Sequence, residues 1–576
     1  MIEAEETIYK GEQCKAEALE CLWKSQSEQL SMLKAFFIEN GSVSNELKSY
    51  LQQANSCQRD AYKNFVEIQT ELINMDKEML ELNKKEIKRF EIQLKEVPLK
   101  KNKISFERGT VLLSEIKDKY YSSIKECLIE SGYKVQGVPF FSSYNDRKKV
   151  FEELPKDVVG FILLMNENST YTDFKQLYFC MKHFLEKLSD FTIKKKFIMG
   201  ISFQDGKFGL MNESEEVTQG SLSGLIKSLN KELKDAFTIK MLDLSRKLPA
   251  DRCKMILNEE LNTEDDCIEI GRDEDGRRYT LELKEKYEEE KVGIQPSKED
   301  VFVVSGGAKG ITAACIIELC RRYSCKFIIL GRSELIDKEE SQLAAAKTRD
   351  ELIKVLLNQI AEKNISCKPS EVMYKASKIL SQREIKNTIE KLNAASKRVV
   401  YCSCDILEEI SVKKAIDRAK EKMGQITGFI HGAGVIRDKK IDMKTEEDFR
   451  LVYGTKSLGA KNILNAINEE NLKYIIFFSS VSGYFGNAGQ TDYAAANEYL
   501  NKLAFRLKQK YPQKVVMSIN WGPWDAGMVS EQLKKSVEKR GRRLISIKEG
   551  IKYFMDQFTQ KHDDGVCQCV IYDLNK

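Results

Sequence analysis

Apolar residues recur alternately four and three positions apart between residues 47 and 82, and no Gly or Pro interrupts residues 47–94. This spacing predicts a long helix with one narrow apolar seam, as in a coiled coil. Such a seam needs a partner. The candidates are a second copy of the chain, an earlier helix expected at about 12–38, and another protein. We predict that residues 1–100 form a helical, coiled-coil segment, and we expect a homo-oligomer formed through it.

Beyond the linker at 97–103 the pattern changes to short apolar runs that alternate with helical patterns. Such alternation is typical of βαβ units and a mostly parallel sheet. Strands are expected at 158–165, 196–203 and 238–244, and then at 301–304, 326–330, 398–402, 427–430, 474–478 and 515–519. The expected fold is α/β, with two Rossmann-like subdomains at 104–296 and 297–576 and a helical insert at about 334–396. The first subdomain has no glycine-rich turn after a strand, so we expect it to bind no nucleotide.

Charge and composition narrow the classes of function. Charged residues make up 31% of the chain with both signs interspersed, and the net charge is only +5, which favours neither a nucleic-acid partner nor a membrane surface. No signal peptide and no apolar run of spanning length is found. Fifteen cysteines without a CxxC spacing and only three histidines indicate reduced thiols in a cytoplasmic protein without a metal site.

The stretch SGGAKGIT lies between the predicted strand VFVV and a helical pattern. A strand, a glycine-rich turn and a helix point backbone N–H groups at a pyrophosphate. An ordinary structural turn is the alternative. The candidate phosphate-loop residues are Ser305, Gly306, Gly307, Ala308, Lys309, Gly310 and Ile311.

The ends of the next strands supply further candidates. Arg332 and Ser333 follow the second strand. At this position an acidic residue would bind the 2′-hydroxyl of NAD. An Arg there suits the 2′-phosphate of NADP instead, and Lys309 is a second cation nearby. Asp405 and Ile406 follow the third strand, facing adenine. Gly432, Ala433 and Gly434 follow the fourth and let a ribose approach the backbone closely. His431 is interpreted as a strand-end residue and not as a base.

A strand ends at Ser480, and Tyr493 follows near the start of a helix that also carries Asn497 one turn later. Reduction of a ketone leaves an alkoxide, which needs a proton donor. A Tyr whose pKa is lowered by a nearby ammonium can serve as this donor, and a Ser hydroxyl can orient the carbonyl. A plain core Tyr is the alternative.

Residues 297–576 resemble the ketoreductase domain of polyketide synthases, a branch of the short-chain dehydrogenase/reductase superfamily. The resemblance rests on VVSGGAKGIT, IILGRS, HGAGVIRDK, YGTKSLGAKN, FSSVSGYFGNAGQTDYAAANEYL and SINWGPWDAGM. Residues 104–296 are similar to the structural subdomain of the same family. The insert and NWGPWDAGMVS are most similar to ketoreductases of polyunsaturated-fatty-acid synthases, followed by those of enediyne-type synthases.

The resemblance implies roles for single residues. Tyr493 would donate the proton, Ser480 would orient the carbonyl, and Lys456 would hold the nicotinamide ribose and depress the Tyr493 pKa, with Asn497 supporting a proton relay. Pro523 would lie in the segment that closes over nicotinamide, and Met528 would begin the substrate lid. Asp438 matches one of three positions of the B-type LDD motif, and Phe485 stands where A-type relatives carry Trp, which favours a (3R) product.

The predicted function is NADPH-dependent reduction of a β-ketoacyl thioester held on an acyl carrier protein. No carrier, ketosynthase or acyltransferase motif is found and the chain begins with Met, so we expect a stand-alone subunit that receives substrate in trans and meets other synthase subunits. A reductase of a free small molecule and a catalytically silent scaffold are the alternatives.

Overall fold

The computed structural model describes residues 86–574 with short gaps. The gaps are 101, 117, 141–143, 194, 212–215, 265, 287–292, 336–338, 363–366, 397, 528–533, 536, 538, 540 and 561–564. The predicted coiled-coil residues 1–85 and Met528 therefore lie outside the described residues. Residues 85–576 form one compact unit.

Seven parallel strands form the C-terminal half of this unit. They are β9 (Val301–Ser305), β10 (Lys326–Gly331), β11 (Val399–Ser403), β12 (Gly428–His431), β13 (Tyr474–Ser480), β14 (Val515–Trp521) and β15 (Gln568–Tyr572). Their spatial order is β11-β10-β9-β12-β13-β14-β15, so the chain crosses over between β11 and β12. Such a reversal of strand order leaves a crevice at the carboxyl ends of the strands, where ligands bind in open α/β sheets.

Seven further strands form the N-terminal half. Its strands are β2 (Thr110–Ser114), β3 (Lys134–Val138), β4 (Val158–Met165), β5 (Lys196–Ser202), β6 (Phe237–Leu244), β7 (Glu269–Arg272) and β8 (Arg278–Glu285). All neighbours are parallel except β7 and β8. The Rossmann-like α/β architecture of the sequence prediction is confirmed.

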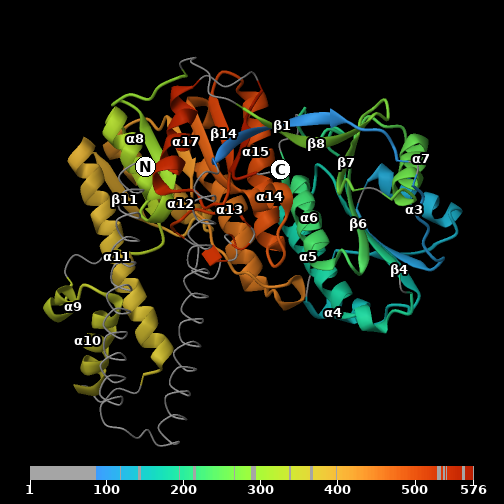
Figure 1. Ribbon diagram of the computed structural model, residues 1–576, viewed down its shortest axis with the longest axis horizontal. Coiled ribbons are helices and arrows are strands. Elements are labelled where there is room, and N and C mark those ends of the chain that lie inside the picture. Colours follow the sequence, from blue (N-terminus) through green and yellow to red (C-terminus); the bar gives the residue numbers. More distant parts are fainter. Residues whose placement is uncertain are drawn as a thin grey trace, which may run out of the picture. The chain divides into compact units, whose positions relative to one another are not determined.

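Strand β1 (Lys88–Glu96) joins the two halves (Figure 1). It pairs antiparallel with β15 on one side and with β8 on the other, so that the described part of the chain forms one continuous sheet of 15 strands. The prediction of helix through residue 100 is wrong for these residues. Phe90, Ile92 and Leu94 alternate with polar residues, and a period of two suits a strand and not a helix.

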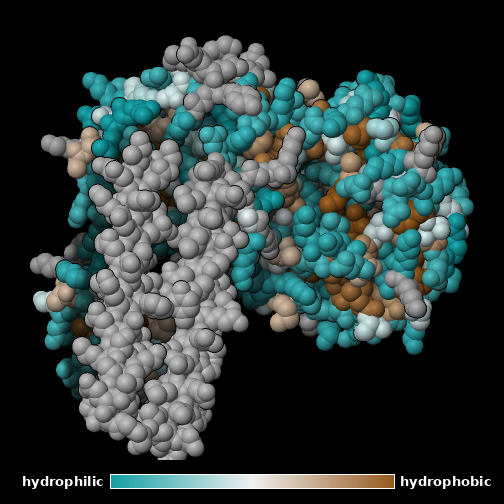
Figure 2. Space-filling model, in the orientation of Figure 1, coloured by the Kyte–Doolittle hydropathy of each residue, from teal (hydrophilic) through white to brown (hydrophobic). Residues whose placement is uncertain are grey.

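Helices cover both faces of the sheet. They are α3 (Lys119–Glu130), α4 (Tyr144–Glu152), α5 (Tyr171–Glu186), α6 (Ser221–Leu233), α7 (Ala250–Leu261), α8 (Gly310–Tyr323), α12 (Glu409–Met423), α13 (Glu446–Ala466), α14 (Val481–Phe485), α15 (Thr491–Lys510) and α17 (Ile547–Thr559). Among the described residues no helix has the length and apolar character needed to cross a membrane. Figure 2 shows hydrophilic side chains over most of the coloured surface in this view, with hydrophobic patches on the half that carries α3 and α7.

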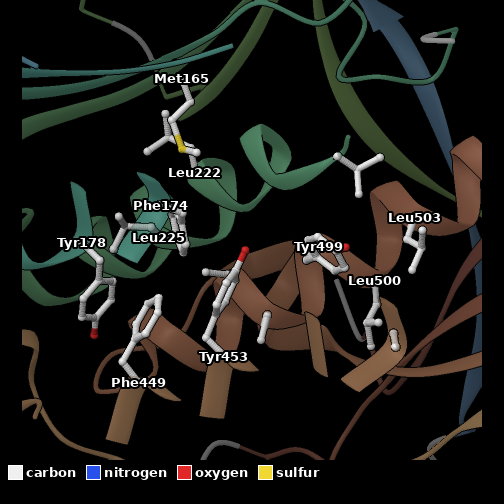
Figure 3. Packing of buried hydrophobic residues seen from close by; sticks show 14 of the residues in the cluster. Met165, Phe174, Tyr178, Leu222, Leu225, Phe449, Tyr453, Tyr499, Leu500 and Leu503 are labelled. Atoms are coloured by element: carbon white, nitrogen blue, oxygen red, sulfur yellow. The ribbon is translucent and has the colours of Figure 1, made fainter. Parts of the chain in front are cut away.

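The two halves share a core. Figure 3 shows Phe174 and Tyr178 of α5 and Leu222 and Leu225 of α6 near Tyr453 of α13 and the side chains of α15. The helices α6 and α15 approach closely at Gly224, where an added Cβ would lie 2.4 Å from the carbonyl oxygen of Ala494. Burial of a large apolar cluster is the main favourable term in folding, so the halves stabilise each other.

The predicted insert is helical, with α9 (Ser341–Ala345), α10 (Arg349–Glu362) and α11 (Pro369–Ser396). A small core of its own holds it together, including Leu352, Leu356, Val372 and Ala376. Helix α11 also contacts the glycine-rich turn: the Glu384 carboxylate accepts a hydrogen bond of 2.9 Å from the Gly310 N–H, and Lys309 Nζ donates to Ser381 Oγ at 2.5 Å.

Candidate active site

A cavity of about 1320 Å³ opens at the carboxyl ends of the C-terminal strands. The structure places most of the predicted site residues in its wall, namely Gly306, Ala308, Lys309, Gly310, Ile311, Arg332, Ser333, Asp405, Ile406, Gly432, Ala433, Gly434, Asp438, Lys456, Ser480, Phe485, Tyr493 and Pro523. Ser305, Gly307 and Asn497 lie behind the wall. The structure thus brings residues from six strand ends and four helices to one cavity.

The glycine-rich turn connects β9 to α8. Gly306 has a φ of +70° and Gly310 a φ of +62°, a conformation that residues with a side chain rarely adopt. A Cβ on Gly306 would lie 2.8 Å from Ala433 Cα, and a Cβ on Gly432 would lie 2.2 Å from Thr312 Oγ1. The absent side chains let the turn pack closely against the end of β12, and Gly310 at the start of α8 has open space around its Cα, although its N–H is bonded to Glu384. This cradle fits the pyrophosphate of a dinucleotide.

Below the turn, Ser305 and His431 hold neighbouring strands together. Their Oγ and Nδ1 atoms lie 2.7 Å apart, and both side chains are fully buried. Burial lowers the pKa of His431 to about 3, so its imidazole is neutral and serves the fold. The interpretation of His431 as a strand-end residue is confirmed.

The end of β10 presents Arg332 to the cavity. Its backbone is fixed because Ser403 Oγ donates to the Arg332 carbonyl and the Tyr401 hydroxyl donates to the Ser333 carbonyl at 2.7 Å. Asp405 follows the neighbouring strand β11, and its carboxylate accepts from the Leu407 N–H at 3.0 Å. The cation and the fixed turn fit a 2′-phosphate.

Ser480 and Tyr493 face the other end of the cavity. Ser480 ends β13 and caps α14, and its Oγ accepts from the Ser482 N–H at 3.2 Å. Tyr493 is the third residue of α15, after a loop that returns the chain to the end of β13. The 13-residue separation in sequence thereby becomes proximity in space.

Lys456 and Asn497 support this pair. Lys456, on α13, donates from Nζ to the Phe478 carbonyl at 2.7 Å, and its Nζ lies 5.7 Å from the centre of the Tyr493 ring. Asn497 Nδ2 donates to the Tyr493 carbonyl at 2.7 Å. Its Oδ1 is buried and has no hydrogen-bond partner among the described residues. A buried acceptor without a partner is costly, so this oxygen is available to a water or a ligand.

Burial governs the protonation of the site. It raises the pKa of Tyr493, although hydrogen bonds from Asn497 and Ser480 act in the opposite direction. It also lowers the pKa of Lys456 to about 7. Desolvation of the phenol thus outweighs these hydrogen bonds, and the expected lowering of the Tyr493 pKa by Lys456 stays a prediction. Tyr493 is held in its protonated form, as a proton donor requires.

The sequence profile of the KR domain family matches residues 301–526. A polyunsaturated fatty acid synthase protein of Thraustochytrium sp. is 33% identical over 361 residues, covering 60% of this chain and 13% of that protein. Polyketide synthase PksN of Bacillus subtilis is 26% identical over 345 residues, covering 58% of this chain and 5% of that protein. The chain therefore spans a small part of the length of these relatives.

Residues 301–526 are therefore similar to a KR domain, and the matched relatives include polyketide synthases. Solved structures agree in fold: an N-terminal ketoreductase from the macrolactin assembly line has a TM-score of 0.61 at 18% identity, covering 88% of this chain and 97% of that one. A ketoreductase domain from the bacillaene assembly line has a TM-score of 0.58 at 20% identity, covering 84% and 97%. At these identities the likeness concerns the fold, which is that of ketoreductase domains.

Two loops of the KR domain form the side of the cavity next to Tyr493. The first, residues 432–444, carries Asp438, and the second, residues 486–490, joins α14 to α15. Gln490 connects them, because its Nε2 donates to Asp438 Oδ2 at 2.9 Å while its Oε1 accepts from Ser482 Oγ at 2.6 Å. Phe485 ends α14 and packs edge-on against Tyr484. We call these two segments the substrate loops.

Sequence reasoning missed three groups at the site. Gln490 stands inside a recognised motif, but its type alone gives no role. Lys444 and Asp492 form a buried ion pair with 2.6 Å between Nζ and Oδ1, and charged loop residues are typical of a surface. Glu384, which accepts from Gly310, is separated from it by 74 residues and carries no sequence signal.

Proposed function

We propose that the protein reduces a β-ketoacyl thioester to the β-hydroxyacyl thioester with NADPH. The observation that carries the proposal is the arrangement around one cavity: the glycine cradle and Arg332 at one end, and Ser480 and a protonated Tyr493 at the other. A carbonyl that lies between these ends would be within reach of both a hydride donor and a proton donor.

The cradle at Gly306 to Ile311 would hold the pyrophosphate, Arg332 with Lys309 the 2′-phosphate, and Lys456 the nicotinamide ribose. When bound, the nicotinamide supplies the hydride that forms the new C–H bond at the carbonyl carbon. Ser480 Oγ would orient the carbonyl by donating a hydrogen bond to its oxygen. Tyr493 Oη would donate its proton to that oxygen as the alkoxide forms, giving the hydroxyl group. Asn497 and Lys456 would then return a proton to the phenolate.

The substrate class and partners rest on the relatives. The similarity to a polyunsaturated fatty acid synthase protein supports an acyl chain carried on an acyl carrier protein, delivered in trans with other synthase subunits. Asp438 in the first substrate loop supports a (3R) product, as in B-type relatives. Self-association through residues 1–100 also stays a proposal. The set of Ser480, Tyr493, Lys456 and Asn497 favours catalysis over a silent scaffold.

The test is the oxidation of NADPH by the purified protein, followed by absorbance, with a β-ketoacyl N-acetylcysteamine thioester and with the same group on a carrier protein. We expect turnover with NADPH, little with NADH, and loss of turnover in Tyr493→Phe. Tyr374→Phe is the matched control, because Tyr374 is 70% exposed on α11. Absence of turnover with either substrate, while NADPH binds, would contradict the proposal and favour the scaffold.

A further inference from the structure

Helix α6 belongs to the N-terminal half, yet its last turn reaches the mouth of the active-site cavity. Lys231 of α6 lies in the cavity wall beside residues of the substrate loops. The next residue, Glu232, is half-buried, and its carboxylate bonds to both loops. Helix α6 also packs against α15 at Gly224, directly behind the turn that carries Tyr493.

Each oxygen of the Glu232 carboxylate accepts a hydrogen bond from a different substrate loop. Oε1 accepts from the Gly489 N–H at 2.8 Å, and Oε2 accepts from the Ile441 N–H at 3.3 Å. A direct bond completes the connection, since the Lys439 N–H donates to the Gly489 carbonyl at 3.0 Å. Hydrogen bonds to a charged carboxylate are stronger than neutral ones. One side chain from the other half of the molecule therefore contributes to the distance between the loops, together with the direct bonds between them.

A second contact fixes the same helix to the second substrate loop. Ser228, one turn before Glu232 and fully buried, accepts from the Asn487 N–H at 3.1 Å. Gly486 lies so close to α6 that an added Cβ would be 2.4 Å from the Lys227 carbonyl carbon. Helix α6 thus contacts the second loop at Gly486, Asn487 and Gly489, and it contacts the first loop through Glu232.

The residues that α6 contacts are neighbours of those that line the cavity. Ile436 and Asp438 line it from the first loop, and Asn487, Ala488 and Gln490 from the second. The hydrogen bond between the side chains of Asp438 and Gln490 is therefore next to the backbone hydrogen bond between residues 439 and 489. A change in loop spacing would therefore alter the wall that a substrate touches next to Tyr493.

We infer that Glu232 is a positioning residue: it fixes the two substrate loops against each other and so determines how the carbonyl is presented to Tyr493 and to the hydride donor. The N-terminal half would then take part in the choice of product enantiomer, besides stabilising the fold. This inference rests on the proposed function.

Glu232→Gln is the principal test variant. The amide keeps one acceptor oxygen and places an NH₂ group against the other N–H donor, so one of the two loop contacts is lost. We expect the KM for the β-ketoacyl thioester to rise about five- to tenfold, the change that follows from losing one hydrogen bond of about 1 kcal/mol or slightly more. We expect kcat to change less than about twofold and the minor enantiomer of the product to increase several-fold.

The controls are quantities that would change if the variant lost its structure in general. The Kd for NADPH, from fluorescence titration, and the Tm should stay at the wild-type values. Glu421→Gln, the same change at an exposed residue of α12, should leave every quantity unchanged. Ser228→Ala removes the acceptor for Asn487 alone and should raise KM and the minor enantiomer in the same direction, by less. It decides the question if Glu232→Gln does not fold.

Three outcomes would overturn the inference. The first is a Glu232→Gln protein with wild-type KM and enantiomer ratio. The second is a parallel loss of kcat, NADPH affinity and Tm, which would make Glu232 a residue of the fold only. The third is a wild-type protein that binds NADPH and reduces no β-ketoacyl thioester, which overturns the proposed function and this inference together.

Discussion

Lys444 Nζ lies 2.6 Å from Asp492 Oδ1, and neither side chain is more than 1% exposed. Lys444 also donates to the Arg437 carbonyl, and Asp492 Oδ1 also accepts from the Tyr493 N–H at 2.9 Å. The pair therefore links the first substrate loop to the backbone of the residue proposed as proton donor. Burial raises the pKa of Asp492 to about 6, against the opposing effect of Lys444.

Asp492→Asn should destabilise the protein by about 3–5 kcal/mol, because it leaves the Lys444 ammonium buried without its counter-ion. Urea unfolding of the cofactor-free protein measures the change. The double variant Lys444→Met with Asp492→Leu should recover most of the stability, since it removes both charges. Equal losses in the single and the double variant would show that the ion pair itself does not matter.

Lys456 should make stability depend on pH. The pKa of Lys456 is about 7 in the folded protein, whereas its ordinary value is 10.5. At a pH between these two values the unfolded chain therefore binds more protons than the folded one. The contribution of Lys456 to the free energy of unfolding therefore rises as pH increases from about 7 to about 10.5. Relative to wild type, Lys456→Met should lose this slope and be more stable at pH 7. Parallel pH profiles of the two proteins would contradict the assignment.

Arg332→Ala should weaken NADPH binding about 10- to 100-fold and leave NADH binding nearly unchanged, because a charge-assisted bond to the 2′-phosphate contributes about 1.5–3 kcal/mol. Fluorescence titration with both cofactors measures the ratio. Arg321→Ala, at a side chain 71% exposed on α8, is the matched control. Equal weakening for NADPH and NADH would place Arg332 outside the 2′-phosphate site.

Gly224→Ala should lower the free energy of unfolding by about 1–3 kcal/mol and reduce kcat, since the new methyl group would force α6 away from the Ala494 carbonyl. Gly454→Ala in α13 is the control: its Cβ would meet the flexible end of Leu407 at 3.2 Å, and alanine favours a helix. Thermal unfolding and NADPH oxidation would be measured on both. Wild-type values for Gly224→Ala would show that the helix contact is adaptable.

The long apolar runs made much of the fold predictable. Residues 158–165 and 474–478 were expected as strands and form β4 and most of β13. Several other strands were missed, among them β3, which reads KVQGV and is largely polar at the sheet edge, and the five-residue β15. Pairing with distant strands, which no local pattern encodes, makes these segments extended.

At the site, sequence motifs identified the residues but not their electrostatics. Ser480, Tyr493 and Lys456 are separated by up to 37 positions, and the structure brings them to one cavity. The direction of the Tyr493 pKa shift could not be predicted, because it depends on burial of the phenol in the folded protein. Glu232 could not be found either, since a Glu at the end of an amphipathic helix usually faces solvent.

Strand β1 has a consequence for the order in which the protein is assembled during synthesis. It is made before any other described strand, and β8 follows nearly two hundred residues later, whereas its second neighbour, β15, is made last. Until Gln568–Tyr572 leaves the ribosome, one edge of β1 stays unpaired. The edge of the C-terminal sheet at β14 stays unpaired as well. Open strand edges invite mispairing, so the nascent chain is vulnerable to aggregation until β15 is available.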